Sequence, residues 1–256
     1  MERTKSALQR IAFLLGLLIL WELAARFGPW PHYLFPSTVE VAKSFWSMAT
    51  DGRLAQASLK SISRLAQGYG ISVAVGVPLG LFTARLALFR RGIKPIVMGL
   101  QALPSITWLP LAILWFGLSE AAIIFVVVMG SLLAISIATE DGVNHIPPLL
   151  LRQATALGVH GPRFYAGVLV PAAFPGIVTG LKLGWSFAWR ALMAGELLFV
   201  SGGLGQLLHT GRELFDVPQV MAVMLAIVAI GVLVDRVIFQ TVEDRVRRRW
   251  GLVPAT

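Results

Sequence analysis

Six strongly apolar stretches divide this chain of 256 residues, and they constrain its fold more than any other feature. A bilayer core is about 30 Å thick, which an α-helix of about 20 apolar residues crosses. Hydrophobic residues make up 56% of the sequence and charged residues only 14%, against about a quarter charged in soluble domains. The sequence therefore predicts an all-α membrane protein with six transmembrane helices, at about residues 11–27, 65–84, 95–116, 121–138, 172–198 and 217–239.

Both ends of the chain fall on one side of the membrane if all six stretches cross it. The first stretch is short and follows a basic start, so a cleaved signal peptide competes with a retained anchor. Its exit, ELAARFG, offers no clear cleavage site, and we expect it to be retained. Fourteen Lys and Arg residues then fall on the side of the termini and six on the other, with Lys182 and Arg190 inside the fifth stretch. Because basic residues concentrate on the cytoplasmic side, we predict cytoplasmic termini.

The residue counts argue against several other classes of protein. The absence of cysteine excludes disulfides, thiolate zinc sites and cysteine nucleophiles. The four histidines are scattered, so we expect no metal site. The net charge of +9 fits cytoplasmic basic residues and lacks the aromatic-interleaved pattern of a nucleic-acid groove. The 13 acidic residues form no catalytic cluster, which disfavours a membrane-embedded enzyme.

The third stretch contains LPSITWLP, in which Pro104 and Pro110 lie six residues apart. Proline removes a backbone donor and clashes with the preceding turn. The freed carbonyls need partners such as Ser105, Thr107, neighbouring helices or water. We expect a kinked or broken helix that lines a translocation path with Pro104, Ser105, Thr107 and Trp108. The alternatives are a loop joining two short helices and a kink that serves only packing.

Small residues recur in the fifth stretch, where Gly176, Gly180 and Gly184 follow one another at intervals of four. This spacing lets helices approach closely in a membrane. We therefore predict a packing face, within the subunit or across a dimer, and a direct role toward substrate is the alternative. Gly76 and Gly80 form a weaker copy of the pattern in the second stretch.

Ionisable side chains in the fifth stretch are costly in lipid and usually face water or the bundle interior. Arg190, which follows Trp189, has a guanidinium suited to a carboxylate, sulfonate or nitrate. We therefore place Trp189, Arg190 and Glu196 on the translocation path. The alternative is that Arg190 forms a structural ion pair. Glu196 lies six residues from Arg190, on a different helix face, so such pairing involves another helix or subunit.

The segment at residues 140–171, here named the coupling loop, is polar and lies between the fourth and fifth stretches. Pro147 and Pro148 suit the first turn of a helix, and Gly158 suits its end in the left-handed conformation. His-Gly-Pro then forms a turn, and Pro162 begins a second short helix. The pattern predicts two short helices that project into the cytoplasm and dock a soluble partner. The alternative is a loop helix that lies against the membrane.

The sequence RQATALGVHGPRFYAGVLVP, which begins at Arg152, resembles the signature loop of binding-protein-dependent ABC transporter permeases. That signature reads Glu-Ala-Ala, three residues, Gly, nine residues, Ile-x-Leu-Pro. Aligning Gly158 with its glycine reproduces the spacing to Pro171. Arg152 stands where the family usually has Glu, Gln153 replaces the first Ala, and Ala154 keeps the second. The lost acidic residue affects any salt bridge that it makes, and leaves the helix-turn-helix geometry intact.

Four other blocks resemble the nitrate, sulfonate and bicarbonate subfamily of these permeases, so the resemblance covers nearly the whole chain. They read WELAARFGPWPHYLFPS, QALPSITWLPLAILWFGLSE, LVPAAFPGIVTGLKLGWSFAWRALMAGEL and GGLGQLLHTGRELFDVPQV. The resemblance implies a single permease domain over residues 1–256 with the type I importer fold and a coupling helix between spans 4 and 5. It places nine residues at the ATPase contact: Arg152, Gln153, Ala154, Thr155, Leu157, Gly158, Val159, His160 and Gly161.

The resemblance also implies the working assembly. Two ATPase subunits dock on the cytoplasmic loops of a permease dimer, and a periplasmic substrate-binding protein delivers a small, anionic solute such as a sulfonate or nitrate. The chain has no G-x-x-x-x-G-K-[ST] motif, so ATP and Mg²⁺ belong to the partner and no cofactor is expected on this chain. The expected location is the bacterial inner membrane. A stand-alone channel or secondary transporter is the alternative.

Overall fold

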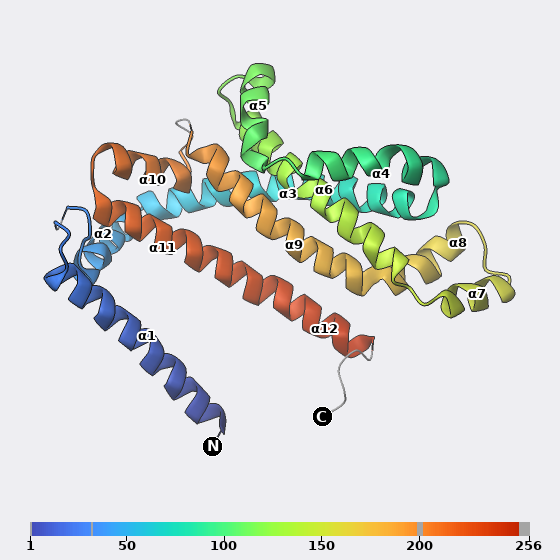
Figure 1. Ribbon diagram of the computed structural model, residues 1–256, viewed down its shortest axis with the longest axis horizontal. Helices are drawn as coiled ribbons and strands as arrows, with labels where there is room; N and C mark the ends of the chain where they lie inside the picture. The colour runs from blue at the N-terminus through green and yellow to red at the C-terminus, as the bar shows by residue number, and fades with distance from the viewer. Residues whose placement is uncertain (1, 32, 199–201, 251–256) are drawn as a thin grey trace. The chain divides into compact units, whose positions relative to one another are not determined.

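The computed structural model describes residues 2–31, 33–198 and 202–250, with side chains from residue 8 onward except those of residues 10 and 11. Every regular element in these residues is helical, as Figure 1 shows. Most are α-helices, η1 is a 3₁₀ turn, and η2 and η3 are π-helical. In chain order they are α1 (Glu2–Phe27), α2 (Thr38–Thr50), α3 (Arg53–Arg85), α4 (Ala87–Gln101), η1 (Ser105–Trp108), α5 (Leu109–Phe116), α6 (Glu120–Asn144), α7 (Pro148–Ala156), α8 (Pro162–Phe164), η2 (Tyr165–Leu169), α9 (Val170–Glu196), α10 (Leu204–Glu213), α11 (Val217–Val234), η3 (Asp235–Gln240) and α12 (Thr241–Arg249).

The helices form two compact units. The first contains residues 1–59 and 202–229, and the second contains residues 60–201 and 230–256. Helices α3 and α11 each begin in the first unit and continue into the second. The single permease domain stays a prediction.

The first unit is organised by the connection between α1 and α2. Glu22 on α1 accepts hydrogen bonds from the backbone N–H and the hydroxyl of Thr38, at 2.9 and 2.6 Å. Ser37 and Glu40 form a capping box that satisfies the free donors at the start of α2. The end of α1 is therefore fixed against the start of α2.

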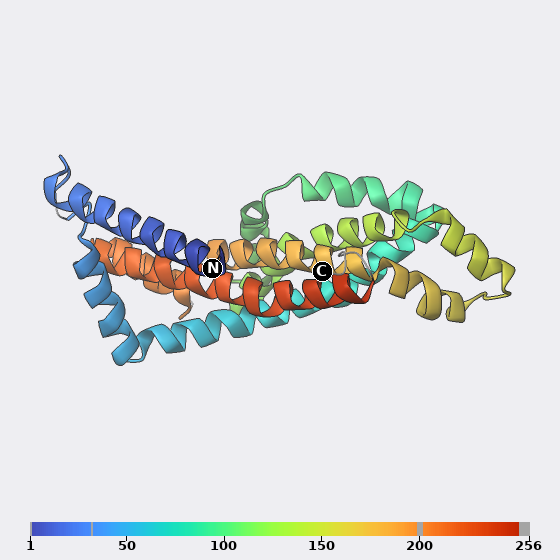
Figure 2. The ribbon, with the colours of Figure 1, turned by 90° about the horizontal axis from the view of Figure 1, so that it is seen from below.

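The second unit is built around α6, whose side chains are buried along much of its length. Ile123, Val126, Val127 and Ile135 are all fully buried. Helix α9 runs alongside α6, as Figure 1 and Figure 2 show. An all-round apolar helix needs neighbours on every side, which is why α6 lies at the centre of this unit.

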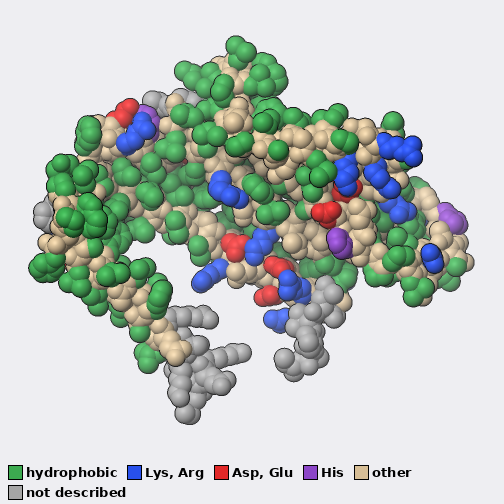
Figure 3. Space-filling model, viewed as in Figure 1, with side chains coloured by type: hydrophobic (Ala, Val, Ile, Leu, Met, Phe, Trp, Pro, Cys, Tyr) green, Lys and Arg blue, Asp and Glu red, His purple; other side chains and the backbone are tan. Residues whose placement is uncertain are grey.

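Four helical stretches of the described chain are long and apolar enough to cross a membrane, at residues 53–85, 120–144, 162–196 and 217–249. Apolar side chains also cover much of the face in Figure 3. These observations confirm an all-helical membrane protein with several spans. The first predicted span, residues 11–27, lies in α1 and includes residue 11, whose side chain is outside the described residues. The count of six spans stays a prediction.

The helices of the third, fourth and fifth predicted stretches have other bounds than those stretches, as do α3 and the segment from α11 to α12. The positions at which they enter and leave the membrane stay predictions. The third stretch is not one helix, because α4 and the η1–α5 segment meet at 102°. The fourth continues through residue 144, so residues 140–144 of the coupling loop are helical. The fifth begins at residue 162, since α8, η2 and α9 are continuous through a π-helical turn. Pro171 lies at the start of α9, just after this π-helical turn, and the helix continues through it.

Candidate functional site

The coupling loop ends its first helix with the predicted left-handed glycine. Gly158 has φ +75°, and its N–H donates to the Thr155 carbonyl at 3.0 Å. The Val159 N–H donates to the Ala154 carbonyl, also at 3.0 Å. These two bonds form a Schellman motif, which satisfies carbonyls that the helix end leaves free. The expectation for Gly158 is confirmed, and α7 begins at the predicted proline pair.

The turn after α7 is attached to the bundle by two buried side chains. Gly161 has φ +62°, and α8 begins at Pro162 as predicted. Ala154 and Phe164 are buried in a cluster with side chains from α3, α6 and α9. The Arg85 guanidinium lies 5.3 Å from the Phe164 ring centre. The loop is therefore packed onto the ends of these helices.

Most of the predicted ATPase-contact residues are accessible. Leu157 is 82% exposed although it is apolar. Ala154 alone is buried and Val159 is half-buried, whereas the exposed members are Arg152, Gln153, Thr155, Leu157, Gly158, His160 and Gly161. Leu157 therefore presents an exposed apolar side chain at the end of α7.

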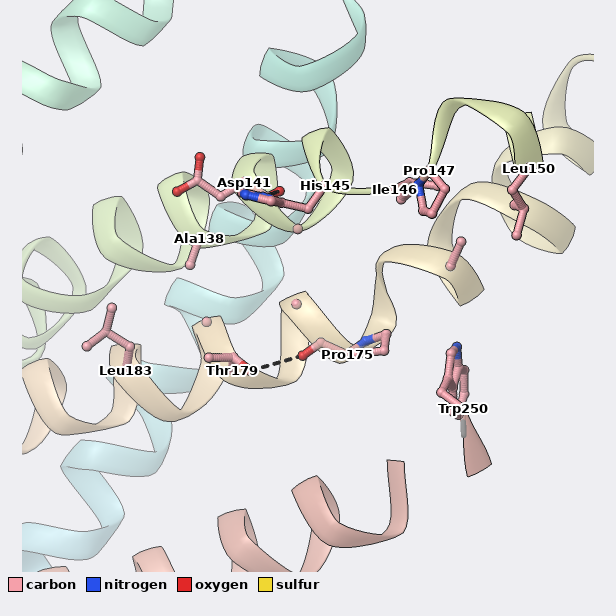
Figure 4. A pocket seen from close by; sticks show the side chains of 14 residues that line it. Ala138, Asp141, His145, Ile146, Pro147, Leu150, Pro175, Thr179, Leu183 and Trp250 are labelled. Carbon is pink, nitrogen blue, oxygen red and sulfur yellow. Dashed lines mark hydrogen bonds between the residues drawn. The ribbon is translucent and has the colours of Figure 1, made fainter. Parts of the chain in front are cut away.

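A cavity of about 740 Å³ lies beside the coupling loop, between the ends of α6 and α9. Figure 4 shows Asp141 and His145 on the α6 side, with Thr179 and Pro175 on α9 and Trp250 near the C-terminal end. The Thr179 hydroxyl donates to the Pro175 carbonyl at 3.1 Å. Most of the remaining lining is apolar.

The glycines of α9 lie against α6. A Cβ on Gly176 would lie 2.6 Å from the Cα of Gly142, and one on Gly180 would lie 2.7 Å from the Cβ of Ala138. Gly184 faces the next turns of α6 equally closely. Backbones in such close approach leave no room for larger side chains. The geometry favours the predicted packing role over contact with substrate.

The glycines of α3 approach α6 in the same way. A Cβ on Gly76 would lie 2.8 Å from the Leu132 carbonyl oxygen, and one on Gly80 would lie 2.7 Å from Thr139 Cβ. The weaker repeat in the sequence thus marks a second close contact. Helix α6 is packed by small-residue faces of two different helices.

The proline-rich stretch joins α4 to the η1–α5 segment at an angle of 102°. Pro104 precedes the 3₁₀ turn η1, and the Thr107 hydroxyl donates to its carbonyl at 2.6 Å. Pro110 lies in the first turn of α5, where it needs no donor. Trp108 packs edge-on against Phe125 on α6, with ring centres 6.4 Å apart. The Pro104 carbonyl at the break thus has its hydrogen-bond partners within η1, since the Thr107 N–H also donates to it at 2.9 Å.

Three predicted path residues meet at one cavity of about 280 Å³. Pro104 and Ser105 at the break, Gly130 on α6, and Phe187 and Arg190 on α9 line it together. The Arg190 Nε donates to a carbonyl of its own helix at 3.1 Å, and its guanidinium lies 4.7 Å from the Phe187 ring centre. Of the remaining predicted path residues, Thr107, Trp108, Trp189 and Glu196 do not line this cavity.

Glu196 belongs to a buried ion cluster away from Arg190. It is fully buried, and Arg64 Nη1 on α3 donates to its Oε1 at 2.8 Å. The Ser61 hydroxyl lies 2.9 and 2.7 Å from its two oxygens. Arg64 Nη2 also bonds Glu120 at 2.9 Å. The partner of Glu196 is thus on another helix, as its six-residue spacing from Arg190 indicated.

Sequence reasoning missed Arg64, Ser61 and Glu120 as members of this cluster. Arg64 directly precedes the predicted second span, so the sequence places it among the six basic residues on the side opposite the termini. Helix α3 begins at residue 53, so Arg64 lies well inside a helix and is 1% exposed. The signal in the sequence was the position of this charged residue, which directly precedes the predicted second span.

Comparison with known proteins places these features in one family. Residues 76–249 match the family model described as "Binding-protein-dependent transport system inner membrane component". An ABC transporter permease protein of Methanocaldococcus jannaschii is 31% identical, covering 94% of this chain and 92% of that one. An aliphatic sulfonates transport permease protein of Escherichia coli is 31% identical, covering 92% and 89%. A bicarbonate transport system permease protein of Synechocystis is 29% identical, covering 92% and 87%.

Solved structures share the fold. The MetNI methionine ABC transporter in inward-facing conformations contains a chain with a TM-score of 0.63 and 20% identity. The match covers 77% of this chain and 95% of that one.

Proposed function

Because this chain belongs to the family of binding-protein-dependent transport system inner membrane components, we propose that it is the permease subunit of an ATP-driven importer for a small anion. Two ATPase subunits bind ATP and Mg²⁺, and a periplasmic binding protein delivers the solute. Two copies of this chain form the membrane dimer. Six spans place both termini in the cytoplasm, with α1 as the first span, since its apolar side chains such as Phe13 and Leu20 are exposed.

The coupling loop is the observation that carries this proposal. It presents an exposed apolar tip at Leu157 beside a rigid turn at Gly158. Its sequence matches the spacing of the family's signature loop. The ATPase would bind this tip, and the eight predicted contact residues other than the buried Ala154 form the proposed docking surface.

Helix α9 supplies a physical connection from the docking surface to the path. The continuous helix from Pro162 to Glu196 begins at the coupling loop and contains Arg190 near its other end. A rigid helix transmits displacement along its axis. ATP-driven movement of the loop would therefore shift Arg190 relative to the break at Pro104, biasing the dimer between inward-open and outward-open states.

The class of solute rests on the relatives and on Arg190. Two similar permeases are named for aliphatic sulfonates and for bicarbonate, which are both anions. Arg190 lines the cavity at the helix break, and a guanidinium binds such groups with paired hydrogen bonds. We therefore place Pro104, Ser105 and Arg190 on the path, and Glu196 in a structural role.

The test is co-purification of the chain from its native membrane, with mass spectrometry for an ATPase subunit. Leu157→Asp places a charge on the docking tip without changing the turn, and Gly158→Pro removes both the φ +75° conformation and the N–H bond to Thr155. The matched control is Leu214→Asp, at another exposed leucine (69% exposed) that we place on the opposite side of the membrane.

We expect the wild type and the control to retain the ATPase and both loop variants to lose it. If folded wild-type protein carries no ATPase, the importer proposal is wrong, and a stand-alone channel or secondary transporter becomes the better reading. If an ATPase stays bound to both loop variants, the docking surface lies elsewhere.

A further inference from the structure

A second cavity adjoins Arg190 on the other side of α9. It has a volume of about 510 Å³ and lies between α9 and the α11–η3 segment. Trp185 and Trp189 form one wall, with stacked rings whose centres are 6.4 Å apart. Gly231 lies against Trp189, and Arg236, in the π-helical turn η3, faces the cavity together with Arg190. Its size falls within the range of about 300–1,000 Å³ that small-ligand sites occupy.

The acidic groups beside this cavity already have cationic partners. Asp235, the one carboxylate in its lining, lies 3.4 Å from Lys182 Nζ and accepts a hydrogen bond from Gln240 at 3.2 Å. Lys182 also lies 3.6 Å from Glu243, which pairs with Arg247 at 2.7 Å. The charges of these four groups sum to zero. No acidic charge among them is therefore left to neutralise Arg190 or Arg236.

The two arginines thus add two positive charges with no carboxylate partner in the described part of the chain. The Nε of Arg190 bonds the Ser186 carbonyl, and its terminal nitrogens have no acceptor among the residues that the structure describes. Within the same residues, nothing accepts a hydrogen bond from the Arg236 guanidinium. Unpaired guanidiniums in a membrane-spanning region are unfavourable unless water or an anion neutralises them. Their exposure in this structure leaves both accessible to a ligand.

We propose that Arg190 and Arg236 together bind a small oxyanion, with the two tryptophans packing against its apolar part. The guanidiniums supply charged hydrogen bonds to sulfonate, carboxylate or bicarbonate oxygens. The Trp185 and Trp189 rings provide the flat apolar wall that an alkyl substituent needs. The inference rests on the proposed importer function, because the bound anion is then the transported solute. Arg236 becomes a specificity-determining residue, whereas the sequence pattern placed it only among cytoplasmic basic residues.

The same chemistry suits the phosphate of an anionic lipid, so the test separates the two sources. The full chain is reconstituted in nanodiscs of phosphatidylcholine alone or with phosphatidylglycerol. Saturable binding of radiolabelled ethanesulfonate is measured, with unlabelled ethyl methyl sulfone as a neutral competitor of similar shape. Native mass spectrometry of the same discs counts retained phosphatidylglycerol.

The variants are Arg190→Gln, Arg236→Gln and Arg236→Lys, and the control is Arg91→Gln, an exposed arginine on α4 that lines neither cavity. We expect each glutamine variant to weaken ethanesulfonate binding about tenfold, as loss of a charged hydrogen bond does. The lysine variant keeps the charge and should lose less. The control and the neutral sulfone should have no effect. Thermal unfolding of each variant shows that it is folded.

Three results would overturn the inference. One is a folded wild type that binds no ethanesulfonate, and another is an affinity that both glutamine variants leave unchanged. The third combines two observations: phosphatidylglycerol blocks the binding of ethanesulfonate, and it is retained by the wild type but not by the double glutamine variant. This result would assign the site to a lipid. Co-purification of the ATPase is scored on the same preparations. If the ATPase co-purifies but the glutamine variants bind ethanesulfonate as well as the wild type does, only this inference fails. If the ATPase is absent, the importer function itself fails.

Discussion

Removal of one member of the buried ion pair between Arg64 and Glu196 should destabilise the second unit strongly. The two side chains are 1% and 0% exposed and lie 2.8 Å apart. Loss of one partner from a buried pair costs about 3–5 kcal/mol, because the other charge stays buried without compensation. Arg64 also lies 2.9 Å from Glu120, a carboxylate that Glu196→Leu leaves in place. We therefore expect the lower limit, about 3 kcal/mol, which lowers Tm by about 6–12 °C for a chain of this size.

The assay is thermal unfolding in nanodiscs, followed by tryptophan fluorescence, on Glu196→Leu, Arg64→Met and the double variant. Replacing both partners by apolar residues removes the uncompensated charge, so the double variant should recover most of the lost Tm. The control is Glu120→Gln, whose side chain is 57% exposed and whose loss should change stability by about 0–1 kcal/mol. The reasoning is refuted if Glu196→Leu shifts Tm no more than this control, or if the double variant is as unstable as the sum of the single variants.

Two further stability measurements test the packing around α6. Gly176→Ala should lower stability by about 1–3 kcal/mol, because the new Cβ would lie 2.6 Å from the Gly142 Cα. The control is Gly70→Ala, which should not destabilise the protein because nothing lies within 4 Å of the new Cβ. Equal losses of Tm in the two variants would contradict the assigned contact. Lys94→Met removes the 2.7 Å partner of Glu140, whose side chain is 4% exposed. It should cost about 1–3 kcal/mol, and the added change Glu140→Gln should restore much of it; a double variant with no recovery would show that the pair does not matter.

In the coupling loop, the sequence predicted some helix ends correctly and missed others. Pro148 and Pro162 begin helices and Gly158 ends one, because proline geometry and left-handed φ are local properties of single residues. The pattern did not show that residues 140–144 continue α6 or that α9 extends back to residue 162. Those extensions depend on packing against neighbouring helices, which supports helical turns that local signals do not require.

The predicted path residues are only partly brought together in the structure. The sequence singled out Pro104, Ser105 and Arg190, and the structure brings all three to one cavity. It also placed Glu196 on the path, whereas that side chain is buried with Arg64. Sequence spacing showed only that Glu196 and Arg190 lie on different faces of one helix. Which partner each charge meets depends on the neighbouring helices.

By itself the sequence determined that this is a helical membrane protein with a polar segment between two apolar stretches. Proline and glycine set the backbone conformation at their own positions, and apolar content sets the preference of a segment for lipid over water. Neither effect depends on which helices pack against the segment. Only the tertiary structure decided the 102° angle in the third stretch and the placement of α6 between two glycine faces. It alone brought Arg236 to the cavity that Arg190 lines. These features join residues that are distant in the chain, and their energies arise from close packing and paired charges that exist only after the helices meet.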